Sequence, residues 1–215
     1  MDGITMSTRG HRHVDGPGGQ SALSWMHVIM DSMMAEAFDP YAAIEAAECT
    51  TDLQERARLL DAAIMHLTSK GDLASAEVQY VIGYAWYQHP AECALRDEKV
   101  QSHLTEALRI NPHQKFAQLY LAHYHFDKKN FPVALKLLQG FEPMEFSRVG
   151  QAWRDAKNAE MILCCGLYLS DHECTSTALV QLCEALTRLE PGTNPDPSEL
   201  AVALHVLTKS AQESR

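Results

Sequence analysis

The sequence lacks the features that mark membrane, secreted and nucleic-acid-binding proteins. No window approaches the roughly 18 apolar residues that a membrane-spanning helix needs, and no charged segment followed by an apolar run begins the chain. Lysine and arginine number 18 against 28 aspartates and glutamates, a net charge of −10, and they form no dense basic block. These absences predict a cytoplasmic protein that binds neither membranes nor nucleic acid.

Disulfide frameworks and metal-binding cysteine pairs are missing as well. A chain of 215 residues can bury about 70% of the surface that its unfolded form exposes, so it needs neither to fold. We interpret most of the cysteines as small core residues in a reducing compartment. The six cysteines of the chain are Cys49, Cys93, Cys164, Cys165, Cys174 and Cys183.

Motifs of the common enzyme classes do not occur. The chain has no G-x-S-x-G, no phosphate-binding loop, no H-E-x-x-H and no dinucleotide-binding glycine pattern. His123 and Asp127 are four residues apart on a predicted helix, which is a spacing that two metal ligands can use, but no third ligand is obvious. We therefore predict no catalytic residue, metal or cofactor. A metal-binding enzyme built on these two residues is the least favoured hypothesis.

Helical periodicity runs through most of the chain. The segments 76–87 (AEVQYVIGYAWY), 115–126 (KFAQLYLAHYHF) and 159–170 (AEMILCCGLYLS) echo one another, with bulky residues at helical spacing around a tiny one. The tiny residues are Gly83, Ala122 and Gly166. No segment shows the alternation of apolar and polar residues that is typical of strands. The sequence predicts an all-α protein.

Caps and prolines indicate where other helices begin and end. The glycine-rich residues 1–20 predict a disordered arm. Asp39-Pro40 predicts a helix start, and Thr51 with Gln54 resembles a capping box for a helix that ends at Gly71. Further helices are expected at 21–38, 39–49, 97–110, 130–140, 174–189 and 196–215. The methionine-rich helix at 21–38 either docks on the rest of the chain or fills a groove.

The paired helices resemble tetratricopeptide repeats, helix–turn–helix units with a period of about 34 residues. Residues 76–87 match the first helix of such a unit, and Leu104 and Leu138, in successive second helices, are 34 residues apart. The resemblance covers 72–191 and implies about three repeats in a superhelix. Within the N-terminal helices at 21–71, residues 53–71 are a candidate for half of a degenerate repeat. The helix at 196–215 would cap the C-terminal end.

Small residues explain physically how such helices can pair. Gly83, Ala122 and Gly166 have little or no side chain, so a partner helix can approach at the short end of the usual 8–10 Å range. One pair cannot cover its own apolar face, so pairs must stack on one another. The partner helices carry matching small residues at Ala107, Ala134 and Ala178.

In the family, the first helices line a concave wall that binds a segment of another protein. Aromatic side chains with a polar tip, beside acidic residues, suit an amphipathic helix or an extended peptide. The alternative for each residue is packing against a neighbouring helix. Transferring the family register gives these candidate groove residues: Glu77, Tyr80, Tyr84, Tyr87, Gln88, Phe116, Leu119, His123, Phe126, Asp127, Glu160, Leu163, Leu167, Ser170 and Asp171.

The resemblance favours a non-enzymatic protein–protein interaction module whose partner is a peptide or helix of another protein. An alternative is a cytosolic chaperone or neutralising partner of a secreted bacterial protein. Small acidic three-repeat proteins with a helical N-terminal extension resemble the translocator chaperones of type III secretion. That alternative implies a homodimer formed through residues 21–38.

Overall fold

The computed structural model describes residues 38–91 and 94–189. The chain divides into two units, Met1–Asp39 and Pro40–Arg215, and every helix given below belongs to the second. The predicted arm at 1–20, the capping helix at 196–215 and all but the last residue of the helix at 21–38 lie outside the described residues.

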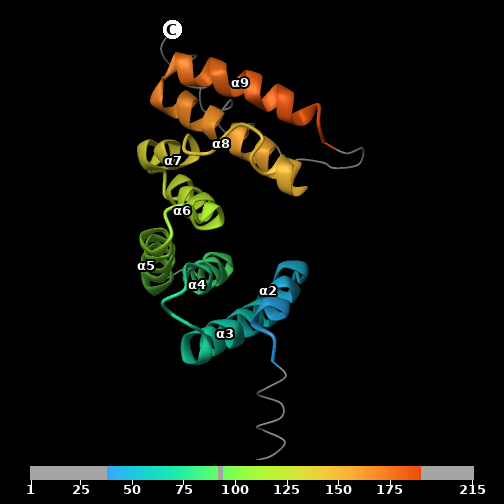
Figure 1. Cartoon of the computed structure of the whole chain (residues 1–215), viewed down its shortest axis with the longest axis vertical. Helices are drawn as coiled ribbons and strands as arrows, with labels where there is room; N and C mark the ends of the chain where they lie inside the picture. The colour runs from blue at the N-terminus through green and yellow to red at the C-terminus, as the bar shows by residue number, and fades with distance from the viewer. Residues whose placement is uncertain (1–37, 92–93, 190–215) are drawn as a thin grey trace, which may run out of the picture. The chain divides into compact units, whose positions relative to one another are not determined.

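Within the described residues the protein is all-helical, with eight α-helices, one 3-10 helix and no strand. This confirms the predicted all-α class. None of these helices is long and apolar enough to cross a membrane. The helices, shown in Figure 1, are α2 (Pro40–Cys49), α3 (Leu53–Lys70), α4 (Ala76–Gln88), α5 (Ala94–Ile110), α6 (Lys115–Asp127), α7 (Phe131–Leu138), η1 (Ser147–Val149), α8 (Ala152–Leu169) and α9 (His172–Leu186).

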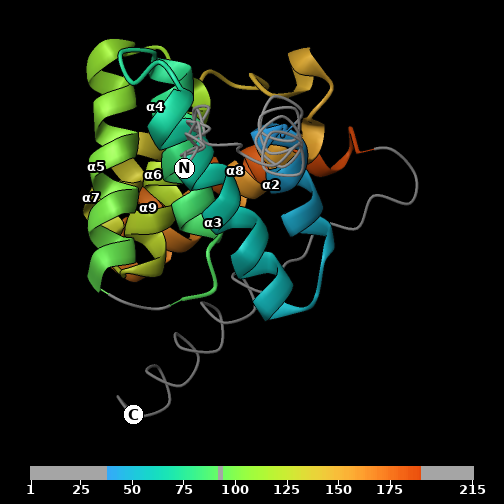
Figure 2. The same ribbon diagram turned by 90° about the horizontal axis from the view of Figure 1, so that it is seen from below.

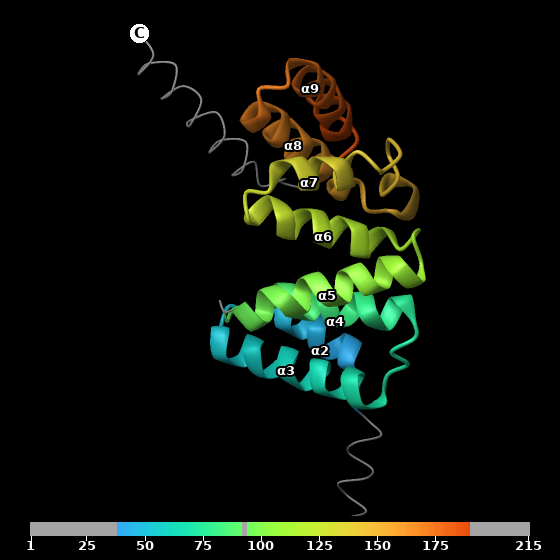
Figure 3. The same ribbon diagram turned by 90° about the vertical axis from the view of Figure 1, so that its left-hand side faces the viewer.

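The α-helices associate as consecutive pairs. The most extensive contacts join α2 to α3, α4 to α5, α6 to α7 and α8 to α9. Contacts of α3 with α4, α5 with α6 and α7 with α8 link one pair to the next, and α4 also touches α6. Figure 3 shows the pairs following one another in chain order. Helices α5 and α7 lie on one side of the stack and α2 on the other (Figure 2).

The tiny residues lie where paired helices meet. A Cβ atom built on Gly83 would be 2.7 Å from Leu104 Cδ2 on α5, and one built on Gly166 would be 2.8 Å from Thr175 Oγ1 on α9. Both distances are too short for a real side chain, so each glycine is needed for the close approach. These two crossings confirm the packing predicted from the sequence. The remaining small residues of the pattern are fully buried: Ala107, Ala122, Ala134 and Ala178.

Two helix starts differ from the sequence-based bounds because local polar groups extend the helix. Helix α8 begins at Ala152, before the expected 159, and Asp155 in its first turn accepts hydrogen bonds from the backbone N–H groups of Phe146 and Ser147. The enlarged loop before it holds η1, which is followed by Gly150, whose φ of 77° suits glycine. Helix α9 begins at His172, because Asp171 accepts from the Cys174 N–H.

Other helix ends move by a few residues. Helix α5 extends back at least to Ala94, three residues before the expected start. Helix α7 ends at Leu138, two residues before Gly140. The starts of α2, α4 and α6 and the end of α5 agree with the sequence-based bounds.

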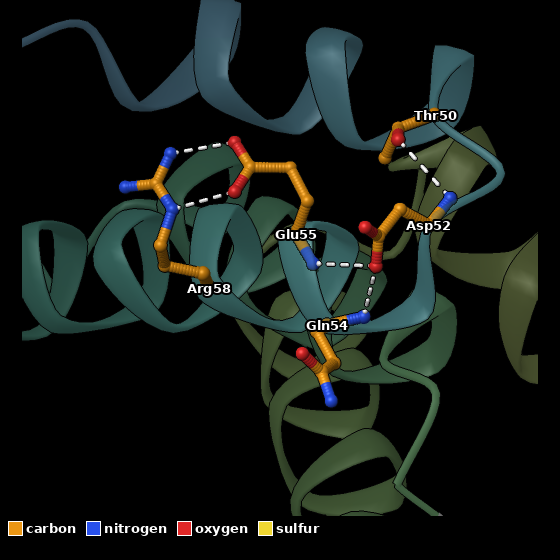
Figure 4. A network of polar contacts seen from close by, with 5 residues as sticks. All are labelled: Thr50, Asp52, Gln54, Glu55 and Arg58. Carbon is orange, nitrogen blue, oxygen red and sulfur yellow. Dashed lines mark hydrogen bonds and ion pairs between the residues drawn. The ribbon is translucent and has the colours of Figure 1, made fainter.

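The cap of α3 corrects the proposed capping box by one residue. Asp52, and not Thr51, is the N-cap: its Oδ1 accepts from the backbone N–H groups of Gln54 at 2.8 Å and Glu55 at 3.3 Å (Figure 4). Its own N–H donates to Thr50 Oγ1 at 3.2 Å. A carboxylate is favoured here because it satisfies two otherwise unpaired donors and meets the positive end of the helix dipole.

Three of the described cysteines are core residues, as interpreted from the sequence. Cys164 and Cys165 are fully buried and Cys174 is buried, whereas Cys49 and Cys183 are exposed; none of these five cysteines is in a disulfide. Burial raises the pKa of Cys165 to about 12, so it stays a neutral packing group at physiological pH.

The Gly83 crossing gives a test of the fold. Gly83→Leu should lower the free energy of unfolding by about 1–3 kcal/mol, because the new side chain must displace Leu104. Chemical denaturation measures the change. Gln101→Leu, on the exposed face of α5, introduces the same residue without overlap and should change stability by about 0.5 kcal/mol or less. Equal effects of the two variants would contradict the crossing.

Candidate functional site

Aromatic side chains of α4 and α6 form one continuous cluster. Tyr80 has ring-centroid distances of 6.0 Å to Tyr84, 5.9 Å to Phe116 and 6.3 Å to Tyr120. Tyr120 is also 4.3 Å from Tyr84 and 5.7 Å from Tyr87. Tyrosines at 80, 84 and 87 share one face of α4, and residues at 116, 120 and 123 share the matching face of α6.

Arg154 on α8 lies over this cluster. Its guanidinium carbon is 5.3 Å from the Phe116 ring centroid, 5.6 Å from that of Tyr120 and 4.4 Å from that of Trp153. Its Nη1 donates a hydrogen bond of 2.8 Å to the Tyr120 hydroxyl. Cation–π contacts of this kind hold a guanidinium flat against aromatic faces. Arg154 therefore joins α8 to the aromatic surface of α6.

The tyrosine hydroxyls are fixed by polar partners on neighbouring helices. Tyr84 donates to a Glu48 carboxylate oxygen on α2 and accepts from Gln88 Nε2 at 3.0 Å. Tyr87 donates to Asp127 Oδ2 at 2.8 Å, which links α4 to α6. Burial, more than any neighbouring charge, raises the pKa of all three α4 tyrosines, so these hydroxyls stay protonated donors.

A cleft of about 340 Å³ opens beside the cluster. The first helix of each pair contributes to its walls: α2, α4 and α6 directly, and α8 through its first turn and the residue before it. The lining residues that carry its chemistry are Tyr41, Glu45 and Glu48 of α2, Glu77, Tyr80 and Tyr84 of α4, Phe116 of α6, and Gln151 and Arg154 at the start of α8.

The structure brings together part of the groove set predicted from the sequence. Tyr87 and His123 adjoin the cluster, with rings 6.5 Å apart. Gln88 and Asp127 bond to tyrosine hydroxyls of α4. The predicted residues that line the cleft are Glu77, Tyr80, Tyr84 and Phe116.

Another part of the set lies in the hydrophobic core. Leu119, Phe126 and Leu163 are only 2%, 6% and 4% exposed and belong to one core cluster, against which the half-buried Leu167 also packs. These residues offer a partner little or no accessible surface, a correction to the sequence-based set. The transferred register placed Leu119 on the wall, whereas α6 turns its neighbour Tyr120 toward the aromatic cluster.

The candidates on α8 do not reach the cleft. Glu160 is 4% exposed and pairs with Lys157 Nζ at 2.9 Å. Ser170 ends α8 in a left-handed conformation with φ of 56°, and Asp171 caps α9. Because α8 starts seven residues before the expected position, its first turn, and not its middle, faces the cleft.

Sequence reasoning missed several residues of the site. Tyr120 could have been found, because 116, 120 and 123 repeat the spacing of 80, 84 and 87. Arg154, Gln151 and the α2 residues carried no such signal, since α8 was not expected to extend to 152 and α2 was not assigned to the wall.

Within the described residues, no third metal ligand accompanies His123 and Asp127. The His123 ring lies edge-on to Tyr120, and its Nε2 is buried without a partner within the described residues. Burial, with smaller contributions from Lys157 and Arg154, lowers the pKa of His123 to about 3. Burial also raises the pKa of Asp127, although the Tyr87 hydrogen bond opposes this. The described part of the chain contains no group of three or more His, Cys, Asp or Glu placed to hold a metal ion.

Comparison with known proteins returns no relative. No protein-family model matches the chain, and neither a curated protein nor a solved structure matches it significantly. The function must therefore be inferred from the cleft and its chemistry.

The buried histidine predicts a pH dependence. The pKa of His123 is lower in the folded chain than its ordinary value of 6.5, so the unfolded state binds the extra proton as pH falls. The neutral, buried imidazole therefore makes its full contribution to the free energy of unfolding above about pH 6.5. Proton binding by the unfolded state removes that contribution progressively as the pH falls toward 3. NMR titration of the imidazole should show a neutral ring down to about pH 4. His123→Asn should reduce the fall in stability between pH 6.5 and 4, and titration of His123 near 6.5 would contradict the prediction.

The Tyr87–Asp127 hydrogen bond predicts a second effect on stability. Tyr87→Phe should lower the free energy of unfolding by about 0.5–1.5 kcal/mol, because it removes a bond between α4 and α6. Tyr124→Phe is the matched control, since no hydrogen bond of the Tyr124 hydroxyl occurs within the described residues. In the Asp127→Asn background, the effect of Tyr87→Phe should shrink; an undiminished effect would show that the bond contributes nothing.

Proposed function

We propose that this protein is a non-enzymatic interaction module of the cytoplasm that binds a segment of another protein in the cleft lined by α2, α4, α6 and the start of α8. The observation that carries the proposal is the aromatic cluster with its polar tips beside an open cleft. Tyr41 at the cleft is 49% exposed and Trp153, stacked on Arg154, is 47% exposed. Large rings that keep such exposure next to a cleft are the side chains enriched in protein interfaces.

We propose further that the helix pairs are tetratricopeptide-like repeats. Four consecutive pairs and the α4–α6 contact support this. Side-chain hydrogen bonds link the first helix of one pair, or the residue just before it, to the first helix of the next pair. The bonded residues are 34, 36, 37 and 40 positions apart, which is near the family period of about 34. The packing of α2 on α3 makes that pair the candidate degenerate unit.

The chemistry of the site supports binding more than catalysis. The tyrosines have raised pKa values and stay protonated. His123 stays neutral near physiological pH, and its Nε2 is buried. None of these groups is poised to exchange protons at neutral pH, as a general acid or base must.

A chaperone for a secreted protein would be a special case of this function. It would be distinguished by a homodimer through residues 21–38, nearly all of which lie outside the described residues. No contact within the described part of the chain favours that special case over a general interaction module.

Site-specific cross-linking tests the proposed function. A photoreactive benzoylphenylalanine in place of Tyr41, at the cleft, should capture a partner protein from a lysate of the native host. The same group in place of Met65, which is 70% exposed on α3, should not. Mass spectrometry of the adducts identifies the partner and the cross-linked segment. Capture of the same partner with equal yield at both positions, or only at Met65, would reject the cleft as the binding site.

A further inference from the structure

The rim of the cleft carries negative charge that no lysine or arginine of the described residues neutralises. Glu45 and Glu48, one turn apart on α2, and Glu77 on α4 are exposed and line the cleft. Within the described residues none of them forms an ion pair with lysine or arginine. Glu48 accepts from the Tyr84 hydroxyl and Glu77 from Gln114 Nε2. These neutral donors leave the carboxylate charges in place.

Some exposed glutamates away from the cleft have a basic partner. Glu55 pairs with Arg58 at 2.6 Å, and Glu106 pairs with Arg109 at 2.7 Å. Each pair lies on one helix surface at a spacing of three residues. In the part of the chain that the structure describes, the cleft glutamates have no such basic partner, so they are available to an incoming cation.

Among the described residues, Arg154 is the only lysine or arginine that lines the cleft. Its guanidinium lies against the aromatic rings and donates to the Tyr120 hydroxyl, and it forms no ion pair with the three glutamates within the described residues. The described lining of the cleft therefore contains three carboxylates and one guanidinium. A chain with a net charge of −10 also attracts basic segments at long range.

Two polar atoms of the cleft residues have no hydrogen-bond partner within the described residues. They are Gln151 Oε1, an acceptor, and Arg154 Nε, a donor, and both are buried. The two residues are three apart at the start of α8, and both line the cleft. Unsatisfied buried groups of this kind are costly. An extended peptide offers one N–H and one C=O per residue to satisfy them, whereas a helix uses these groups internally.

We propose that the cleft binds an extended peptide segment with lysine or arginine side chains. Its cationic side chains meet Glu45, Glu48 and Glu77, and its backbone pairs with Gln151 and Arg154 after a small adjustment of these two side chains. This inference rests on the proposed function and specifies the class of partner that the cleft accepts.

Fluorescence anisotropy with designed peptides tests the inference on the full-length chain. The probe is a short labelled peptide in which lysine alternates with serine, and two matched peptides carry glutamine or glutamate in place of lysine. The lysine peptide should bind about tenfold or more tightly than the glutamate peptide, with the difference shrinking as salt is added. A lysine peptide with alternate backbone amides methylated keeps its charge and should bind several-fold more weakly.

Matched variants locate the binding. Glu45→Gln with Glu77→Gln should weaken binding of the lysine peptide by about threefold to tenfold. Glu173→Gln with Glu184→Gln removes the same number of charges from exposed residues at a second cleft, formed by α7, α8 and α9, and should change binding little. A larger effect of the second pair would place the peptide elsewhere and overturn the inference.

The remaining outcomes separate this inference from the proposed function. Equal binding of the three peptides, or no loss on backbone methylation, overturns the basic extended segment. No binding of the lysine peptide also overturns it. In each case the cross-linking at Tyr41 decides independently whether the cleft binds some other kind of segment.

Discussion

The close crossing of paired helices is the constraint on which the rest of this structure depends. Gly83 lets α5 approach until Leu104 occupies the space that a side chain would fill. With that face of α4 occupied by α5, the face that carries the tyrosines turns toward α6. The aromatic cluster is thus a consequence of how tightly the pairs close, because a helix held on one face can present only the other to its neighbour.

Polar groups within the aromatic cluster determine how the first helices are placed relative to one another. Hydroxyl contacts from Tyr84 to Glu48 and from Tyr87 to Asp127 tie α4 to α2 and to α6. Arg154 adds α8 by lying on rings of α6. Directional bonds of this kind fix orientation more than they add stability, since each replaces a bond to water. They leave a cleft that has an aromatic wall and an acidic rim.

The candidate site was predictable only in part. Residues placed by local helical spacing were predicted, whereas residues placed by contacts between distant segments were not. The α4 tyrosines were predicted because their spacing is local and repeats every turn of the helix. Leu119 was assigned to the wall and Tyr120 was missed, because a shift of one position rotates a side chain by about 100° around the helix. Arg154 was missed because the start of α8 depends on Asp155 bonding to the preceding loop, a contact without a periodic signature.

The sequence by itself determined the all-α class, the positions of most helices and the small residues at their crossings, because helix periodicity, caps and side-chain size act over a few neighbouring residues. Only the tertiary structure decided which faces meet. It brought α2 and the first turn of α8 to the aromatic surface and placed three glutamates beside it, none of them paired with a lysine or arginine of the described residues. That outcome depends on how successive pairs stack, because residues more than 100 positions apart, such as Tyr41 and Arg154, line the same cleft only as a result of all the packing angles between them.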